Sequence, residues 1–292
     1  MDSCQNIFEM NNVFAIIVTY NPDIRQLKTQ FEMLVCQVSG IVYVDNNSES
    51  CCFLDSIDNE KVIIIKNRRN LGLAKAQNQG IEIAQERGAD FVLLLDQDSE
   101  PSGRLVENLL KCFYIANAIR PVALIGPSIR DMFHPEDNVK YEGVILNSIF
   151  IKRVPIERVT EVSYCIASGS LIPLPVIREV GGMLEEFFID SIDMEWCLRA
   201  KKSGFYTFQT NTTILNHYLG NGKHHKIKSH NPKREYYITR NSLLMIRLSY
   251  IPLGYRIRKI FTTLGRVLVS LFNFEYDYLK SELMAVRDSI KY

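Results

Sequence analysis

The 292-residue sequence lacks any uncharged apolar run of 18 or more residues, which excludes a membrane-spanning helix of ordinary length. It also lacks a Cys-x-x-Cys pair, and its seven scattered cysteines favour reduced thiols over a zinc site or a disulfide framework. The formal net charge is only +1, so nucleic-acid binding is not expected. The first twelve residues contain no apolar core of a signal peptide, and we therefore expect a cytoplasmic protein.

What the sequence does contain is an ordinary globular composition, with 47% hydrophobic and 23% charged residues. Short apolar runs alternate with longer segments whose apolar residues recur at helical spacing. This alternation predicts an α/β fold with a doubly wound, largely parallel sheet. The expected strands are 13–19, 41–44, 62–66, 91–95 and 122–125, and the expected helices are 24–38, 73–87 and 105–119.

The run Phe91–Leu95 is followed directly by Asp96 and Asp98. Ligands of open α/β sheets bind beyond the carboxyl ends of the strands, so this acidic pair lies where a site is expected. Two carboxylates there suit Mg²⁺ or Mn²⁺ carrying a diphosphate. A solvated turn or a helix cap explains the same residues equally well when the pair is considered alone.

Two other strand ends carry polar residues. Asp45, after strand 41–44, offers an acceptor for a nucleobase N–H, although Asp-Asn-Asn-Ser is also a good Asx-turn. Asn70-Leu71-Gly72 leads into a helix, where free backbone N–H groups favour phosphate. The competing interpretation is that Gly72 is only a turn residue.

The second half is less regular. We expect strand-like pieces at 141–145 and 148–154, and strands over 163–174, 206–209 and 213–216. A helix over 192–202 begins with acidic residues, and His217 follows the last strand. The basic stretch 223–234 is either a lid over the diphosphate or a solvated loop. A helix begins near Pro232, and amphipathic helices broken at Pro252 complete the chain.

Several motifs in this order carry a family resemblance: IIVTYN, VDNNS, NRRNLGLAKAQNQG, LLLDQDS, a Gly-Gly segment before two phenylalanines, FIDSIDMEWCLR and HYLG. Together they resemble family 2 glycosyltransferases with the GT-A fold, most of all bacterial rhamnosyltransferases. The resemblance implies a Rossmann-like, mostly parallel central sheet flanked by helices, with a C-terminal helical extension. It implies a GT-A domain over 1–245, with a nucleotide-binding half (13–127) and an acceptor and catalytic half (128–245), followed by a basic amphipathic extension (246–292).

The resemblance also assigns roles. Asp96, Asp98 and His217 would hold Mn²⁺ or Mg²⁺, with Asp98 binding the ion directly. The catalytic base would be Asp193, with Glu195 second and Asp190 third, although Ile192 replaces the acid that usually precedes the base. Trp196 would contact the acceptor or pack in the core. The nucleotide-sugar contacts would be Thr19, Tyr20, Asn21, Asp45, Asn70, Gly72, Lys75, Asn78, Asp96, Gln97 and Arg240.

The implied reaction is inverting, metal-dependent transfer of a sugar from a nucleotide-diphosphate donor, with dTDP-L-rhamnose the first donor to test. The acceptor would be a glycan or a polyprenyl-linked saccharide in bacterial surface polysaccharide (O-antigen) synthesis. A UDP-sugar donor carrying galactose, galactofuranose or another hexose is an open alternative. From other classes, a nucleotidyltransferase and a non-catalytic nucleotide-sugar-binding module remain.

The last fifty residues carry Arg256, Arg258 and Lys259 among apolar residues, with no acid between 247 and 266. Such a segment can lie on the anionic inner face of the plasma membrane as a peripheral contact. It can equally pack on the catalytic domain or on a second subunit of a homo-oligomer.

Overall fold

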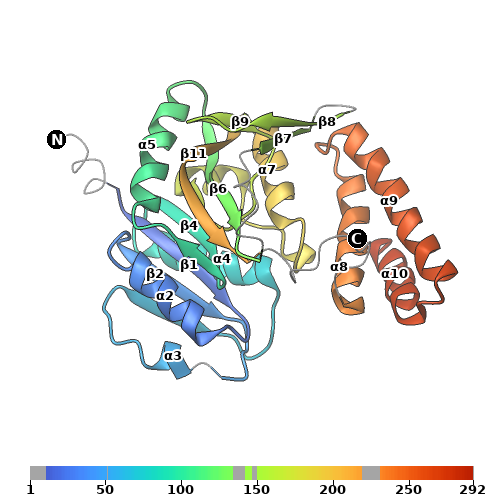
Figure 1. Cartoon of the computed structure of the whole chain (residues 1–292), viewed down its shortest axis with the longest axis horizontal. Helices are drawn as coiled ribbons and strands as arrows, with labels where there is room; N and C mark the ends of the chain where they lie inside the picture. Colours follow the sequence, from blue (N-terminus) through green and yellow to red (C-terminus); the bar gives the residue numbers. More distant parts are fainter. Residues whose placement is uncertain (1–10, 51, 134–141, 147–149, 219–230, 292) are drawn as a thin grey trace.

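The computed structural model describes residues 11–50, 52–133, 142–146, 150–218 and 231–291. An α/β body holds a twisted central sheet, and three C-terminal helices lie together at one side of it (Figure 1). This arrangement confirms the predicted fold class, including the helical extension.

The central sheet has the order β3-β2-β1-β4-β10-β6-β11-β5, and β9 also pairs with β11. The pairs β1–β2, β2–β3, β1–β4 and β6–β11 are parallel, whereas β10 runs antiparallel to both β4 and β6. The pairings among β1, β2, β3 and β4 are therefore parallel as predicted, and the rest of the sheet is mixed. The strands are β1 Val13–Thr19, β2 Gly40–Asp45, β3 Val62–Lys66, β4 Phe91–Asp96, β5 Ser99–Pro101, β6 Val122–Asp131, β9 Thr160–Val162, β10 Ser170–Pro173 and β11 Tyr206–His217.

Two hydrophobic clusters cover the two faces of this sheet. In β1, Val13, Ala15 and Ile17 face one cluster, whereas Phe14 and Ile16 face the other. This alternation explains why uninterrupted apolar runs became strands buried on both sides. Helices α2 (Ile24–Leu34), α3 (Cys52–Asp55) and α5 (Leu105–Asn117) cover the first face; α4 (Leu73–Glu86), α6 (Leu174–Val180) and α7 (Ile192–Lys202) cover the second.

Several predicted boundaries were wrong. The strand predicted over 163–174 is confined to β10 at its end, and the pieces 206–209 and 213–216 form one strand, β11, with a register shift inside it. Residues 99–101, for which no strand was predicted, form β5 and pair with β11. The pieces β7 (Glu142–Leu146) and β8 (Ile151–Pro155) form a separate antiparallel hairpin.

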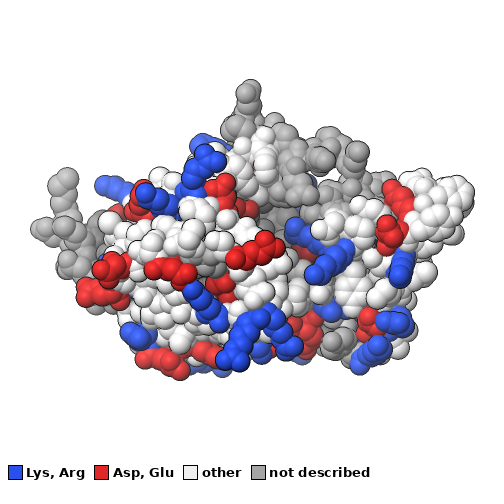
Figure 2. Space-filling view, turned by 90° about the horizontal axis from the view of Figure 1, so that it is seen from below, with Lys and Arg blue, Asp and Glu red and all other residues white. Residues whose placement is uncertain are grey.

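The C-terminal helices are α8 (Pro232–Arg247), α9 (Leu253–Phe272) and α10 (Tyr276–Ser289). Tyr236 on α8 donates a hydrogen bond to Asp288 on α10 at 3.1 Å, which ties these two helices together. No helix among the described residues is both long and apolar enough to cross a bilayer. Figure 2 shows acidic and basic side chains interspersed over one face of the body, with a largely uncharged surface at the far end of the extension.

The five cysteines within the described ranges, Cys36, Cys52, Cys112, Cys165 and Cys197, are all free thiols. This agrees with the expectation of reduced cysteines drawn from their spacing.

Candidate functional site

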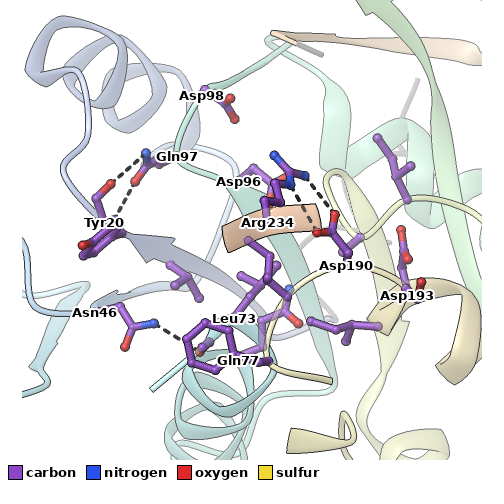
Figure 3. A pocket seen from close by; sticks show the side chains of 18 of the residues that line it. Tyr20, Asn46, Leu73, Gln77, Asp96, Gln97, Asp98, Asp190, Asp193 and Arg234 are labelled. Atoms are coloured by element: carbon purple, nitrogen blue, oxygen red, sulfur yellow. Dashed lines mark hydrogen bonds and ion pairs between the residues drawn. The ribbon is translucent and has the colours of Figure 1, made fainter. Parts of the chain in front are cut away.

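A pocket of about 550 Å³ lies at the carboxyl ends of β1 and β4 (Figure 3). It is the place where ligands of open α/β sheets are expected to bind. Ionisable side chains from four distant segments meet there: Asp96 and Asp98, Asp190 and Asp193, His217, and Arg234. The pocket thus brings together the predicted metal ligands and two of the three predicted catalytic acids.

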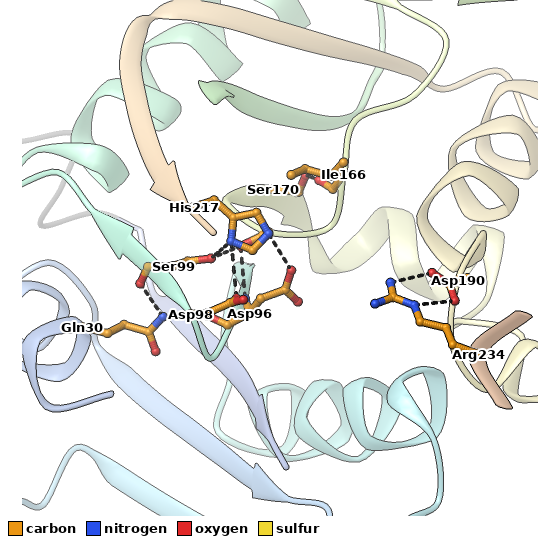
Figure 4. Close-up of polar contacts among 10 residues, drawn as sticks. Gln30, Asp96, Asp98, Ser99, Ile166, Ser170, Asp190, His217 and Arg234 are labelled. Atoms are coloured by element: carbon orange, nitrogen blue, oxygen red, sulfur yellow. Dashed lines mark hydrogen bonds and ion pairs between the residues drawn. The ribbon is translucent and has the colours of Figure 1, made fainter. Parts of the chain in front are cut away.

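Asp96, Asp98 and His217 each present a ligand atom, and these atoms lie within 4.8 Å of one another. His217 Nε2 lies 3.5 Å from Asp96 Oδ2, and His217 Nδ1 lies 3.4 Å from Asp98 Oδ1 (Figure 4). We call these three residues the metal cluster. Two carboxylates and an imidazole form a donor set that suits Mn²⁺ or Mg²⁺.

The sheet explains how residues 118 positions apart in the chain meet. β5 runs antiparallel to β11, so Ser99 lies directly opposite His217, and Ser99 Oγ lies 3.0 Å from His217 Nδ1. Gln30 of α2 is fully buried and donates to the Asp96 and Ser99 carbonyls at 2.8 and 2.7 Å, which fixes the intervening turn. Neither the Ser99–His217 contact nor the Gln30 contacts were predicted. The segment 99–101 is too short for its sequence to show that it is a strand.

The electrostatics of the cluster favour a cation. Burial raises the pKa of Asp96, the His217 charge lowers it, and the neighbouring Asp98 carboxylate raises it again. Burial likewise raises the pKa of Asp98, opposed by His217. Two partly buried carboxylates that repel each other are stabilised by a bound divalent ion, so the residues fit the metal that the resemblance implies.

Asp193 lies at the start of α7 and lines the same pocket. Its pKa is raised to about 6, chiefly by burial and in part by the charges of Asp96 and Asp190, against a hydrogen bond from the Met194 N–H. Ile192 stands where the acid that usually precedes the base is expected. Burial, Asp96 of β4 and Asp190 three residues earlier raise this pKa instead, so the carboxyl can accept a proton near neutral pH.

The turn before α7, residues 187–191, holds an unusual backbone. Phe188, Asp190 and Ser191 have φ values of 59°, 68° and 66°, a left-handed conformation that costs a non-glycine residue about 1 kcal/mol or more. Asn241 stabilises it, because its fully buried side-chain amide donates to the carbonyls of Phe187, Ile189 and Asp190 at 2.8, 2.6 and 2.9 Å. We call residues 187–191 the acidic turn.

Asp190 is engaged by Arg234 of α8. The guanidinium donates to both carboxylate oxygens, with Nε–Oδ2 and Nη2–Oδ1 distances of 3.1 and 2.9 Å (Figure 4). A carboxylate held in a bidentate ion pair is a poor proton acceptor, which leaves Asp193 the better placed base. Arg234 also brings a positive charge to the pocket and lowers the pKa of Asp96 and Asp98.

Glu195 and Trp196 do not line this pocket. Glu195 is fully buried and pairs with Arg199 at 2.7 and 3.0 Å, and it also accepts a hydrogen bond from Tyr250. Trp196 is 1% exposed, and its indole donates to the Gly181 carbonyl at 2.9 Å. The geometry favours a structural role for both side chains: core packing for Trp196, and an ion pair within α7 for Glu195.

On the nucleotide side, Tyr20 is 49% exposed at the pocket rim, and its backbone N–H donates to Gln97 Oε1 at 2.7 Å. Asp45 is buried, and it accepts from Thr19 Oγ1 at 3.0 Å and from the Ser48 N–H at 3.1 Å, which is the Asx-turn alternative. Asn21, in a left-handed conformation, accepts from the Glu49 N–H. Tyr20 and Gln97 thus face the pocket, whereas Thr19, Asn21 and Asp45 shape the loops behind it.

The expectation of free N–H groups at residues 70–73 was wrong. The N–H groups of Leu71, Gly72 and Leu73 donate to Asn46 Oδ1, Asn70 Oδ1 and the Phe188 carbonyl. Gly72 has φ 88°, and a Cβ there would lie 2.5 Å from the Phe188 ring. Gly72 therefore allows the acidic turn to pack on α4, and Asn70 and Gly72 line the pocket without offering these amides.

Three further predicted contacts lie outside the pocket. Lys75 pairs with Glu185 at 2.7 Å, and Asn78 exchanges hydrogen bonds with the Met183 backbone at 2.9 and 2.8 Å. Arg240 is buried, and it donates to the Glu186 carbonyl and to Asn241 Oδ1. Each of the three side chains supports the segment around the acidic turn.

Two further residues line the pocket, and sequence reasoning missed the first of them. Gln77 of α4 is 3% exposed, lines the pocket, and its Oε1 has no hydrogen-bond partner among the described residues. Asn46 also lines the pocket, donating to Asn70 Oδ1 and the Gly72 carbonyl at 3.1 Å each. Helical spacing places Gln77 on the sheet-facing side with Ala74 and Ile81, which is the one signal that could have marked it.

The predicted lid, residues 223–234, is described only from 231 onward, so Lys223, Lys226, Lys228, His224, His225 and His230 lie outside the described residues.

Residues 15–177 match the family model of glycosyl transferase family 2. Across 293 aligned residues the chain is 32% identical to the dTDP-rhamnosyl transferase RfbF of Shigella flexneri, covering 96% of each chain.

Solved structures show the same fold at lower identity. The S. aureus TarS 1–349 complex with UDP-GlcNAc superposes with a TM-score of 0.60 at 14% identity, covering 94% of this chain and 81% of that one. GalNAc-T7 with UDP, GalNAc and Mn²⁺ superposes with a TM-score of 0.59 at 15% identity, covering 85% of this chain but only 54% of that one.

Proposed function

Because the chain belongs to glycosyl transferase family 2 and is a glycosyltransferase, we propose that it transfers L-rhamnose from dTDP-L-rhamnose to a glycan or lipid-linked acceptor. The observation that carries this proposal is the pocket in which the metal cluster and Asp193 meet. The donor is proposed from the dTDP-rhamnosyl transferase at 32% identity. The family leaves no basis for the nucleotidyltransferase alternative.

The metal cluster is proposed to bind the donor. A divalent ion held there would neutralise charge on the leaving nucleoside diphosphate. Tyr20 and Gln97 at the rim, with Asn46 beside Asn70, would hold the nucleoside. The Mn²⁺ named for the GalNAc-T7 structure supports a divalent ion without deciding between Mn²⁺ and Mg²⁺ for this chain.

Asp193 is proposed to act as general base. A hydroxyl oxygen of the acceptor forms the new bond to the anomeric carbon, the bond from that carbon to the diphosphate oxygen breaks with its electron pair, and the hydroxyl proton passes to Asp193. With a pKa of about 6, the carboxyl is largely ionised at neutral pH. One displacement inverts the anomeric configuration.

A UDP-sugar donor is the second candidate, favoured by the UDP-GlcNAc of the TarS structure, which has the same fold. For the acceptor, we propose a step of surface polysaccharide assembly at the inner face of the plasma membrane.

Calorimetry tests the donor class. Titration of dTDP, UDP and GDP, each with and without Mn²⁺, should give Mn²⁺-dependent binding of dTDP, and NMR of the product from dTDP-L-rhamnose should show an inverted linkage. Preferential binding of UDP would favour a UDP-sugar as the donor over dTDP-L-rhamnose. Retention of configuration would contradict Asp193 as a general base.

A further inference from the structure

A second cavity, of about 560 Å³, lies between the β7–β8 hairpin, α7, α8 and α9. Its lining is strongly cationic, with Arg153, Arg258, Lys259 and Arg266, and contains no carboxylate among the described residues. We call it the cationic cavity. Nothing in the donor site described above uses these side chains.

The positive charge of the cavity is only partly compensated by its surroundings. Arg266 pairs with Glu235 of α8, and Arg153 pairs with Glu142 at 3.0 Å. Arg258 and Lys259 have no carboxylate partner among the described residues; Lys259 instead lies 5.3 Å above the Tyr255 ring. Burial, together with the charges of Arg266 and Arg258, lowers the pKa of Lys259 to about 8. Cations crowded together in this way favour an anion.

Hydroxyl groups complete the lining. Thr239 is 1% exposed, and its Oγ1 lacks a hydrogen-bond partner among the described residues, although the side chain lines the cavity. Ser242, Thr262 and Thr263 lie around it. Arginine, lysine and hydroxyl donors together are the groups that bind phosphate.

The cationic cavity lies next to the catalytic residue. Met194 and Tyr164 line it, and Met194 directly follows Asp193, which lines the donor pocket. The Asp193 charge also raises the pKa of Tyr164, after the larger effect of burial. Residues 193–194 therefore lie between a pocket that contains the metal cluster and a cavity that contains cations.

Helix α9 contributes two opposite faces. Tyr255, Arg258, Lys259, Thr262 and Arg266 line the cavity, whereas a second set at helical spacing on the opposite face is 42–69% exposed: Ile257, Ile260, Phe261, Leu264, Leu268 and Leu271. An amphipathic helix typically sinks about 5–10 Å into the headgroup boundary. Since a helix is about 10–12 Å across, the cationic face of α9 would then lie near the level of lipid phosphates.

We propose that the cationic cavity binds the phosphate or diphosphate group of a lipid-linked saccharide acceptor, whose sugar hydroxyl is thereby presented to Asp193. The inference rests on the proposed function and adds to it the class of acceptor. Arg258 and Lys259 are the principal phosphate ligands, and the exposed apolar face of α9 holds the protein against the bilayer in which the lipid is anchored.

Calorimetry with farnesyl diphosphate as the probe tests the cavity, with dTDP and Mn²⁺ saturating so that the donor site is occupied. The double variant Arg258→Gln/Lys259→Gln should bind the probe roughly tenfold more weakly or worse, since two charge-assisted contacts are lost. Lys280→Gln, which removes an exposed lysine of α10, is the matched control and should bind as wild type does. Farnesol should not bind, and inorganic diphosphate should bind more weakly than the farnesyl ester.

Three outcomes overturn the proposal. Equal binding of the probe by the double variant and wild type removes the cavity from acceptor recognition. Equal affinity for inorganic and farnesyl diphosphate indicates a site for a free anion. A double variant that loses only its binding to phosphatidylglycerol vesicles indicates a lipid headgroup site. Mn²⁺-dependent dTDP binding by the double variant shows that the variant is folded. If the wild-type protein does not bind dTDP with Mn²⁺, the proposed function is contradicted instead.

Discussion

The metal cluster and the acidic turn border one pocket but are built in different ways. Asp96, Asp98 and His217 lie at or beside the ends of hydrogen-bonded strands, and the β5–β11 register holds them together. The acidic turn contains three left-handed residues and is held by side chains from α8. The comparison teaches that the proposed donor site rests on the sheet, whereas the turn that precedes Asp193 depends on contacts between segments about fifty residues apart.

The largest expected effect concerns the metal cluster. Asp98→Asn removes one charged ligand of the divalent ion, so we expect the transfer rate to fall about a hundredfold or more and the Mn²⁺ requirement to shift upward. The measurement is initial rate against Mn²⁺ concentration with dTDP-L-rhamnose.

Glu100→Gln is the matched control, because Glu100 is a carboxylate in the neighbouring strand β5 that is not part of the cluster. An unchanged Mn²⁺ dependence in Asp98→Asn would refute the assignment of the metal cluster.

The second-largest effect should distinguish the role of the acidic turn from that of the metal cluster. Asn241→Ala leaves three carbonyls of the acidic turn without their donor, so we expect kcat to fall roughly tenfold to a hundredfold while Mn²⁺-dependent dTDP binding is retained. Kinetics and calorimetry on the same preparation measure the two quantities. Equal losses in both would mean that the acidic turn and the metal cluster are not independent.

A smaller effect is expected from substitution of Gln77, which lines the pocket bordered by the metal cluster and the acidic turn. Gln77→Leu removes a buried amide whose oxygen lacks a partner, so we expect stability to be unchanged or increased and the donor KM to rise several-fold. Thermal unfolding and donor titration measure these changes.

Glu82→Gln, an exposed substitution on the same helix, should alter neither quantity. A clear loss of stability in Gln77→Leu, with donor KM unchanged, would make Gln77 purely structural.

The smallest effect concerns pH and stability. Because the pKa of Asp193 is raised to about 6 in the folded chain, ionising this group disfavours the folded state as pH rises from about 4 to 6. Asp193→Asn should therefore raise the melting temperature by a few degrees at pH 8 and have little effect at pH 4. A lower melting temperature at pH 8 would contradict the burial that raises this pKa.

Much of the metal cluster could be predicted from the sequence. Buried strands of a parallel sheet are recognisable as apolar runs, and Asp96 and Asp98 lie directly at the end of one. His217 was also identified, from the family motif, although its contact with Ser99 depends on a three-residue strand that local sequence did not reveal.

The second region could not be predicted in the same way. Asp193 was placed at a helix start, but the raised pKa comes from burial and from Asp96, almost a hundred residues away. Arg240 and Lys75 were expected at the ligand from the family resemblance; the fold uses them instead to support segments behind the pocket. Gln77 was missed because an amide on a helix face carries no local sign of lacking a partner.

The most direct test of the central claim, that Asp193 acts as the base beside a donor held by the metal cluster, is to measure binding and transfer together in Asp193→Asn. We predict dTDP affinity with Mn²⁺ equal to that of wild type, and a transfer rate lower by about a hundredfold to ten-thousandfold. Transfer at the wild-type rate would contradict the claim, as would loss of nucleotide binding in a variant that remains folded.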